Sequence, residues 1–246
     1  MRRKKNASDK MTAKILFEDE TLLVIDKPAG VVVNRAETTK NQETVQDWIE
    51  DNFDFPLAHC QNLRNGLVHR LDKETSGLLL TAKTQKAFED LQQQFKERKI
   101  KKKYLALAHG RVEPAQGMIQ AAISRSPFDR KKFGVFLGGR EAKTNYKVEK
   151  YYHLDTENYS FLELTPLTGR THQIRVHLKF IGHPLVADEK YTGRKTLRKD
   201  LEWCPRLFLH AASLSFSHPV SHQEINLSSE LPSDLRLAII KLKSNE

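Results

Sequence analysis

The chain has 246 residues, of which 39% are hydrophobic and 29% charged, a balance typical of a globular protein with one large domain or two closely packed halves. No apolar run approaches the ~18 residues of a membrane-spanning helix, and no apolar segment follows the basic start as it would in a secretory signal. We therefore expect no membrane contact and a cytoplasmic location.

The chain is basic, with 41 lysines and arginines against 31 acidic residues and a formal net charge of +10. Such an excess favours a polyanionic partner, because each phosphate that a basic side chain neutralises releases condensed counterions. Composition alone is equally compatible with a basic protein that binds no nucleic acid. The two cysteines, Cys60 and Cys204, form no metal-ligand motif, and reduced thiols are expected rather than a disulfide.

Apolar periodicity predicts a series of strands and helices along the chain. The expected strands lie at 15–33 (a hairpin and a third short strand), 66–71, 78–82, 104–108, 142–152, 160–167 and 206–216. The expected helices lie at 44–53, 84–98 (with Thr84 as N-cap), 171–181 and after Pro232. Residues 111–139, with their glycines, prolines and basic side chains, are expected to be the most loop-like part. Because strands outnumber helices and do not alternate regularly with them, an α+β fold is favoured over a doubly wound sheet.

The segment His69-Arg70-Leu71-Asp72, which continues as Lys-Glu-Thr-Ser-Gly, places polar residues between two apolar strands. An aspartate at such a strand-to-turn junction often accepts backbone N–H bonds and shapes the turn. The alternative is that its carboxylate takes part in chemistry. On pattern alone the structural role of Asp72 is favoured.

The segment 168–177, Thr-Gly-Arg-Thr-His-Gln-Ile-Arg-Val-His, predicts a helix with a basic face. His172, Arg175 and Lys179 lie close to one stripe, because residues three and four apart are neighbours on a helix. That stripe is either a solvated surface or a place where an arginine points inward and pairs with a carboxylate. His172 and His177 are five residues apart with no acidic residue between them, so no metal site is expected.

A run of three lysines, Lys101, Lys102 and Lys103, ends on the aromatic Tyr104 at the start of a predicted strand. Cations beside an aromatic ring suit an unpaired or flipped base, through phosphate neutralisation and stacking. A tyrosine next to lysines is more often an amphipathic residue at the edge of a sheet. The segment alone leaves both interpretations open.

Together, these segments resemble the signature of the RluA-type pseudouridine synthases, in the same order along the chain. The matching stretches are LLVIDKPAG, HRLDKETSG, KKKY, TGRTHQIRVHL followed by IGHP, and LFLHAASLSFSHP. The similarity extends roughly from Ile15 to Leu231. The chain departs from the family's pattern at Asn34, where many members have histidine or proline, and at Ala187, which replaces a common glycine. The small N-terminal RNA-binding domain of many members is expected to be missing.

The resemblance implies the pseudouridine-synthase catalytic fold, a mixed and mostly antiparallel sheet with flanking helices and loops and an active-site cleft across its middle. It implies isomerisation of uridine to pseudouridine in RNA, a reaction that needs no redox change and no group donor. Neither a cofactor nor a metal is therefore expected, and the sequence has no G-x-G-x-x-G and no P-loop.

The resemblance also assigns roles to individual residues. Asp72 becomes the essential carboxylate, either as nucleophile at the ribose or as the base that removes a ribose proton. Arg175 supplies the cation that a buried carboxylate needs beside RNA phosphates, and Tyr104 lies against the uracil. Arg70 enters the RNA stack as the uridine flips out. The residues expected to contact RNA are Arg70, Lys101, Lys102, Lys103, Arg170 and His172.

We expect residues 1–13 to be a disordered basic arm and residues 14–246 to form a single catalytic domain that acts as a monomer. The substrate is expected to be ribosomal or transfer RNA, and the sequence leaves the choice open. One alternative is a non-catalytic RNA-binding protein on the same scaffold. Another is a small-molecule hydrolase that uses Asp72 with His69, although His69 and Thr75 are expected to shape the turn instead of reacting.

Overall fold

The computed structural model describes residues 11–39 and 42–244, and the chain divides into two compact units. Unit 1 comprises the residues up to Ile100 together with Ser215–Ser229, and unit 2 comprises Lys101–Leu214 together with the residues from Glu230 onward. Each unit is therefore built from two stretches that are distant in sequence. The predicted basic arm lies outside the described residues except for its last three, and the single catalytic domain stays a prediction.

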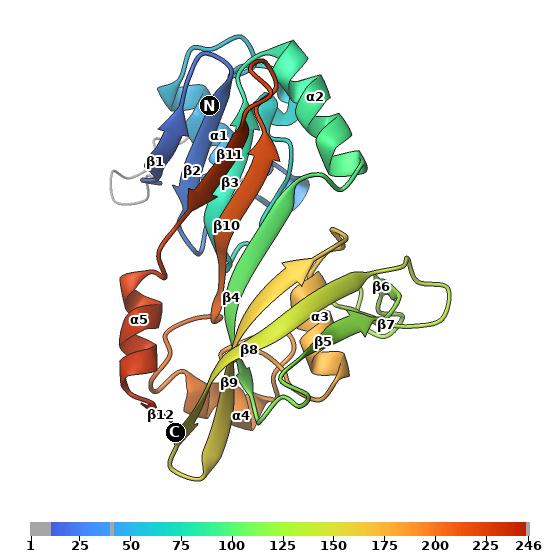
Figure 1. Cartoon of the computed structure of the whole chain (residues 1–246), viewed down its shortest axis with the longest axis vertical. Coiled ribbons are helices and arrows are strands. Elements are labelled where there is room, and N and C mark those ends of the chain that lie inside the picture. The colour runs from blue at the N-terminus through green and yellow to red at the C-terminus, as the bar shows by residue number, and fades with distance from the viewer. Residues whose placement is uncertain (1–10, 40–41, 245–246) are drawn as a thin grey trace. The chain divides into compact units, whose positions relative to one another are not determined.

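Unit 1 contains three consecutive antiparallel strands, coloured blue to green in Figure 1. They are β1 (Lys14–Glu18), β2 (Leu22–Lys27) and β3 (Ser76–Ala82). Every residue of β3 is buried, as its continuous apolar run predicts. The predicted hairpin is confirmed, but the third short strand is reduced to a single parallel bridge between Val32 and Thr44.

The second stretch of unit 1 contains β11 (Glu224–Ser228), which pairs with β10 (Leu209–Ser217). Two hydrogen bonds join this stretch to the first strands of the unit. The Ser229 hydroxyl donates to Asp26 Oδ2 at 2.6 Å, and His218 Nε2 lies 2.8 Å from Asp19 Oδ2. Residues about 200 positions apart in sequence therefore stabilise the same unit.

Both helices predicted for unit 1 are confirmed. Helix α1 (Val45–Asn52) follows Thr44, whose hydroxyl accepts the Asp47 N–H while the Asp47 carboxylate accepts the Thr44 N–H. This reciprocal pair is a capping box, which satisfies two otherwise unpaired donors. Helix α2 (Gln85–Lys96) begins after Thr84, the N-cap expected from the sequence. The described part of unit 1 also contains the short 3₁₀ segments η2 (Glu37–Thr39) and η3 (Gln61–Gly66).

In unit 2 the neighbouring strands follow the order β10-β4-β9-β8-β12, and the pairs β4–β9, β9–β8 and β8–β12 are antiparallel. These strands include β4 (Lys101–His109), β8 (Lys143–Leu154), β9 (Glu157–Pro166) and β12 (Lys243–Ser244). The strands predicted near 104–108, 142–152 and 160–167 are confirmed. The α+β fold with a mostly antiparallel sheet is confirmed as well.

The prediction of a loop at 111–139 is wrong, because this stretch contains three strands. Strand β5 (Gln116–Gln120) pairs with β8, and β6 (Ile123–Arg125) pairs with β7 (Phe133–Val135). The partner of β5 lies about 25 residues further along the chain, so local composition did not reveal the pairing.

Three helices belong to unit 2: α3 (Gln173–Phe180), α4 (Arg194–Asp200) and α5 (Ser233–Ile240). The helix expected at 171–181 begins two residues later than predicted, because His172 has a φ of 55°, which is left-handed backbone. Helix α4 was not predicted, whereas the helix after Pro232 is confirmed. None of the helices in the described part of the chain has the length and apolar character that crossing a bilayer would take.

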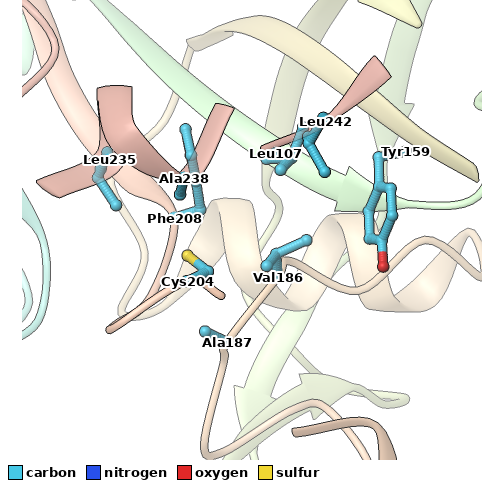
Figure 2. Close-up of a cluster of buried hydrophobic side chains, with 9 residues drawn as sticks. All are labelled: Leu107, Tyr159, Val186, Ala187, Cys204, Phe208, Leu235, Ala238 and Leu242. Carbon is cyan, nitrogen blue, oxygen red and sulfur yellow. The ribbon is translucent and has the colours of Figure 1, made fainter. Parts of the chain in front are cut away.

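A cluster of buried apolar side chains forms a core of unit 2 (Figure 2). Its members are Leu107, Tyr159, Val186, Ala187, Cys204, Phe208, Leu235, Ala238 and Leu242. Burial raises the pKa of the Cys204 thiol to about 12, so the thiol stays neutral and packs as a small apolar group. Cys60 and Cys204 are both free cysteines.

Candidate active site

Asp72 lies in unit 1, on the short turn that leads into β3. Its carbonyl oxygen accepts the N–H of Thr75 at 3.2 Å, which closes the turn. The neighbouring side chains of Leu71 and Thr75 are buried, whereas that of Asp72 is partly exposed. The turn is therefore anchored by its neighbours, and Asp72 itself is partly exposed.

A buried lysine fixes the backbone of the same turn. Lys27 has no exposed surface, and its Nζ donates to the carbonyl oxygens of Pro28, Val31 and Lys73 at 2.7, 2.9 and 3.2 Å. The Lys73 carbonyl also accepts the N–H of Gly30 at 2.8 Å. Gly30 has a φ of +83°, a conformation that glycine adopts without steric cost. The loop after β2 is thus hydrogen-bonded to Lys73, the residue that follows Asp72.

His69 contributes to this region through its side chain, whereas Thr75 contributes through its backbone N–H. His69 Nε2 accepts the N–H of Leu80 at 2.9 Å, and its ring packs against Phe95 with the centroids 5.2 Å apart. Because Nε2 accepts, the neutral ring carries its proton on Nδ1. A histidine whose Nε2 is engaged by the backbone cannot exchange a proton with a substrate there. This geometry argues against the hydrolase alternative.

Tyr104 lies in β4 of unit 2, and its side chain is 8% exposed. Successive side chains of a strand point to opposite faces, so Lys102 shares the face of Tyr104 while Lys101 and Lys103 share the other. Burial lowers the pKa of the Lys102 ammonium. Lys101 and Lys103 are exposed, and Lys103 Nζ lies 3.0 Å from a carboxylate oxygen of Glu163. The three lysines therefore divide between two faces of the strand.

Arg175 lies on α3 in unit 2 and is 4% exposed. Its Nε donates to Asp188 Oδ2 at 2.8 Å and its Nη2 to Asp188 Oδ1 at 2.7 Å. Its guanidinium carbon lies 5.1 Å from the ring centroid of Tyr191. Of the two interpretations left open for this stripe, Arg175 matches the inward arginine paired with a carboxylate and not the solvated surface. The partner expected from the sequence was Asp72, and that pairing stays a prediction; Asp188 was missed.

His172 and Arg170 lie in the turn before α3. The Nδ1 of His172 is 2.7 Å from the Tyr191 hydroxyl, and the Nε of Arg170 donates to the Glu141 carbonyl at 3.0 Å. The backbone N–H of Arg170 donates to Gln173 Oε1, also at 3.0 Å. Both residues therefore help to shape the turn. Their predicted RNA contacts, like that of the exposed Arg70, stay predictions.

A buried chain of hydrogen bonds begins at Gln173, a residue that sequence reasoning did not single out. Its Nε2 donates to Thr144 Oγ1 at 2.9 Å, and that hydroxyl donates to His177 Nδ1 at 2.9 Å. His177 Nε2 then donates to the carbonyl of Ala121 at 3.1 Å. Burial lowers the pKa of His177, so its ring stays neutral at pH 7. Both ring nitrogens thus face protein partners.

Within residues 11–39 and 42–244, no three His, Cys, Asp or Glu side chains converge as the ligands of a metal ion would. Residues 21–180 match the family of RNA pseudouridylate synthases. The chain belongs to this family. The match covers more than half of the chain and includes Asp72, Tyr104 and Arg175, so the RluA-type resemblance is confirmed.

Curated RNA pseudouridine synthases resemble the chain over nearly its whole length. An uncharacterized RNA pseudouridine synthase of Synechocystis sp. is 38% identical over 239 residues, which cover 93% of this chain and 68% of that protein. Ribosomal large subunit pseudouridine synthase D of Neisseria meningitidis is 38% identical over 247 residues, which cover 95% of this chain and 63% of that protein. The chain therefore spans less than two thirds of the length of the second relative.

Solved structures of the RNA pseudouridylate synthase family have the same fold. Human RNA pseudouridylate synthase domain containing 1 has a TM-score of 0.75 and 25% identity, and the match covers 99% of this chain and 92% of that one. Human RNA pseudouridylate synthase domain containing 4 has a TM-score of 0.69 and 26% identity, with 93% of each chain covered. The catalytic fold inferred from the motifs is confirmed. A cleft that brings Asp72 of unit 1 to Tyr104 and Arg175 of unit 2 stays a prediction.

Proposed function

We propose that this chain converts uridine to pseudouridine in RNA, with Asp72 as the essential carboxylate. The proposal is carried by the family match over residues 21–180, because this stretch contains Asp72, Tyr104 and Arg175. The reaction breaks the bond between the ribose C1′ and uracil N1, turns the uracil and joins C1′ to C5. The proton that C5 loses balances the proton that N1 gains. No oxidant, reductant or group donor enters.

Asp72 acts either as a nucleophile or as a base. As a nucleophile, it attacks C1′ while uracil leaves, and C5 of the turned uracil later displaces it. As a base, it removes a proton from the ribose, which it returns after the new bond forms. The anchored turn that carries Asp72 suits both routes, because either one requires a fixed position of the carboxylate relative to the sugar.

Arg175 serves as the counter-charge of Asp72. A carboxylate that is desolvated beside RNA phosphates is driven towards its neutral form. A guanidinium compensates for this, because it stays charged when buried and presents donors in a fixed plane. The Asp188 carboxylate already compensates for the burial of Arg175, so the role towards Asp72 rests on the family match that contains both residues.

RNA contacts surround this chemistry. Tyr104 stacks on the target uracil, and Arg70 occupies the place that the flipped uridine leaves, which offsets part of the few kcal/mol of unstacking. Lys101, Lys102, Lys103, Arg170 and His172 bind the surrounding phosphates. The net charge of +10 supports an RNA substrate over a small neutral one.

Large-subunit ribosomal RNA is the proposed substrate. Support comes from the names of relatives in Neisseria meningitidis and Nitrosomonas europaea, both ribosomal large subunit pseudouridine synthase D. Pseudouridine positions are mapped in total RNA from cells with and without the protein. Sites lost from large-subunit RNA support the assignment, whereas losses confined to transfer RNA would replace it.

The catalytic role is tested with Asp72→Asn, assayed for pseudouridine formation and for RNA binding. We expect conversion to disappear while RNA affinity changes little, because the amide keeps the size of the carboxylate and can act neither as nucleophile nor as base. Glu74→Gln, two residues along the same turn, is the matched control. An Asp72→Asn protein that still converts uridine would overturn the proposal, and a wild-type protein that binds RNA without converting it would favour the non-catalytic alternative.

A further inference from the structure

A buried carboxylate, that of Asp188, lies beside Arg175, and the motifs gave it no role. Asp188 has no exposed surface, although burying a carboxylate is costly unless cations and hydrogen bonds compensate. Its oxygens accept from Nε and Nη2 of Arg175 at 2.8 and 2.7 Å. Such a bidentate pair sets the plane of the guanidinium as well as its distance.

The main chain holds Asp188 itself in place. Its Oδ1 also accepts the backbone N–H groups of Lys190 at 3.0 Å and Tyr191 at 3.2 Å, which closes a tight turn. One residue earlier, the N–H of Ala187 donates to Asp200 Oδ2 at 2.9 Å. Ala187 has a φ of 55°, a left-handed conformation that is uncommon for residues other than glycine. The position of the carboxylate is therefore fixed by backbone groups on both sides.

An aromatic ring fixes the face of the same guanidinium. The ring of Tyr191 lies 5.1 Å from the guanidinium carbon of Arg175, within the range of a cation–π contact. The Tyr191 hydroxyl accepts the N–H of Phe133 at 3.1 Å and is bonded to His172 Nδ1 at 2.7 Å. Asp188 thus binds the N–H groups along the edge of the guanidinium, and the Tyr191 ring contacts its flat face. Together they hold the cation in one orientation.

We propose that Asp188 is a positioning residue for pseudouridine formation, which holds the guanidinium of Arg175 in the orientation that the reaction requires. The inference rests on the proposed role of Arg175 as the counter-charge of Asp72. Asp188 acts through Arg175 and not on the substrate. Its effect falls on the maximal rate, because a displacement of ~1 Å in a positioned group can cost about 100-fold in rate.

The test measures single-turnover conversion and RNA affinity of the full chain carrying Asp188→Asn. The amide nitrogen cannot accept a hydrogen bond from Arg175, so the guanidinium loses one of its two bonds. We expect the maximal rate to fall about 100-fold and the RNA affinity to change less than about threefold. Glu189→Gln, next in the chain and exposed, is the matched control and should retain both. A full maximal rate in Asp188→Asn overturns the proposal, as does a loss confined to RNA affinity.

A double-mutant cycle separates this proposal from the one it rests on. In a protein that already carries Arg175→Gln, Asp188→Asn is expected to lower the maximal rate by less than about threefold more. The reason is that Asp188 acts through the guanidinium, which is missing from this variant. A full additional loss overturns the role of Asp188 and leaves that of Arg175 intact. Full activity of Arg175→Gln alone overturns the role of Arg175 instead. Thermal unfolding checks that each variant folds, and the cycle is run with Asp188→Glu if Asp188→Asn does not.

Discussion

Lys27 is fully buried, which is unusual for a lysine. A lysine side chain is almost never fully buried unless its ammonium group has partners. Its Nζ bonds to three backbone carbonyls, one of which belongs to the turn that carries Asp72. We predict that Lys27→Met, which keeps the length and removes the donors, lowers the free energy of unfolding by about 3 kcal/mol. The rate of pseudouridine formation should fall as well, since the turn loses an anchor. Denaturant unfolding and a conversion assay measure the two effects.

Lys73→Met is the matched control for Lys27→Met. The side chain of Lys73 is exposed, and only its backbone carbonyl takes part in the anchor, which the substitution preserves. Equal stability of the two variants would contradict the structural role of the buried ammonium.

His177 makes the stability of the protein depend on pH. Burial lowers its pKa from the ordinary value of 6.5, although the bond to the Ala121 carbonyl raises it in part. The unfolded chain therefore binds a proton at a higher pH than the folded chain does. Its contribution to stability is full above pH 6.5 and is lost as the pH falls below that value. We predict a smaller loss of stability on acidification in His177→Gln than in the wild type.

The measurement is the denaturant midpoint as a function of pH. His59→Gln, which changes an exposed histidine, should follow the wild-type profile. A wild-type profile that is flat through the lower pH range, or one that His177→Gln leaves unaltered, would show that another group governs acid stability.

The two aspartates beside the proposed chemistry differ in how far the sequence could predict them. Asp72 is recognisable because the residues around it form an ordered motif with Tyr104 and Arg175. Asp188 follows a short apolar run without any local signal, and its partner Arg175 lies 13 residues earlier. The physical reason is that this ion pair depends on how α3 and the following turn are placed in the folded structure. The residues next to Asp188 in sequence do not specify that placement.

Among the helices, the starts of α1 and α2 could be predicted from their capping residues. The start of α3 could not, because it depends on an unusual backbone conformation. Thr44 and Thr84 are recognisable caps because a hydroxyl accepts the exposed N–H groups of the first turn. The start of α3 was misplaced because a histidine in left-handed backbone has no sequence signature. Strand β5 was missed because its partner, β8, is distant in sequence.

The alternation of β4 leads to a prediction about RNA binding. Lys101 and Lys103 lie on the exposed face of the strand, so neutralising both should reduce the number of phosphate contacts. We expect Lys101→Gln with Lys103→Gln to lower the slope of log affinity against log salt by about 2. Binding titrations at several salt concentrations measure the slope. Lys86→Gln, on an exposed position of α2, is the control, and an unchanged slope in the double variant would place β4 away from the RNA.

At the scale of the whole molecule, each unit requires two separate stretches of the chain. Unit 1 is completed by Ser215–Ser229, which supplies β11 and the bonds from Ser229 to Asp26 and from Gln94 to the Ser217 carbonyl. No shift in composition marks either boundary, so the length was compatible with two packed halves but the sequence did not locate them. It arises because the chain leaves unit 1 after α2 and returns to it along β10.

We predict that a fragment ending at Ile100 does not fold cooperatively, because it lacks the strand and the hydrogen bonds that residues 215–229 contribute. Far-ultraviolet circular dichroism during denaturant unfolding detects this as the absence of a sigmoidal transition. The matched control joins residues 215–229 to the same fragment through a flexible glycine-serine linker, which should restore the transition. A fragment ending at Ile100 that unfolds as cooperatively as the linked one would show that β1, β2, β3, α1 and α2 suffice. In that case residues 215–229 only add contacts to a unit that is already stable. The stability of unit 1 would then not depend on its second stretch.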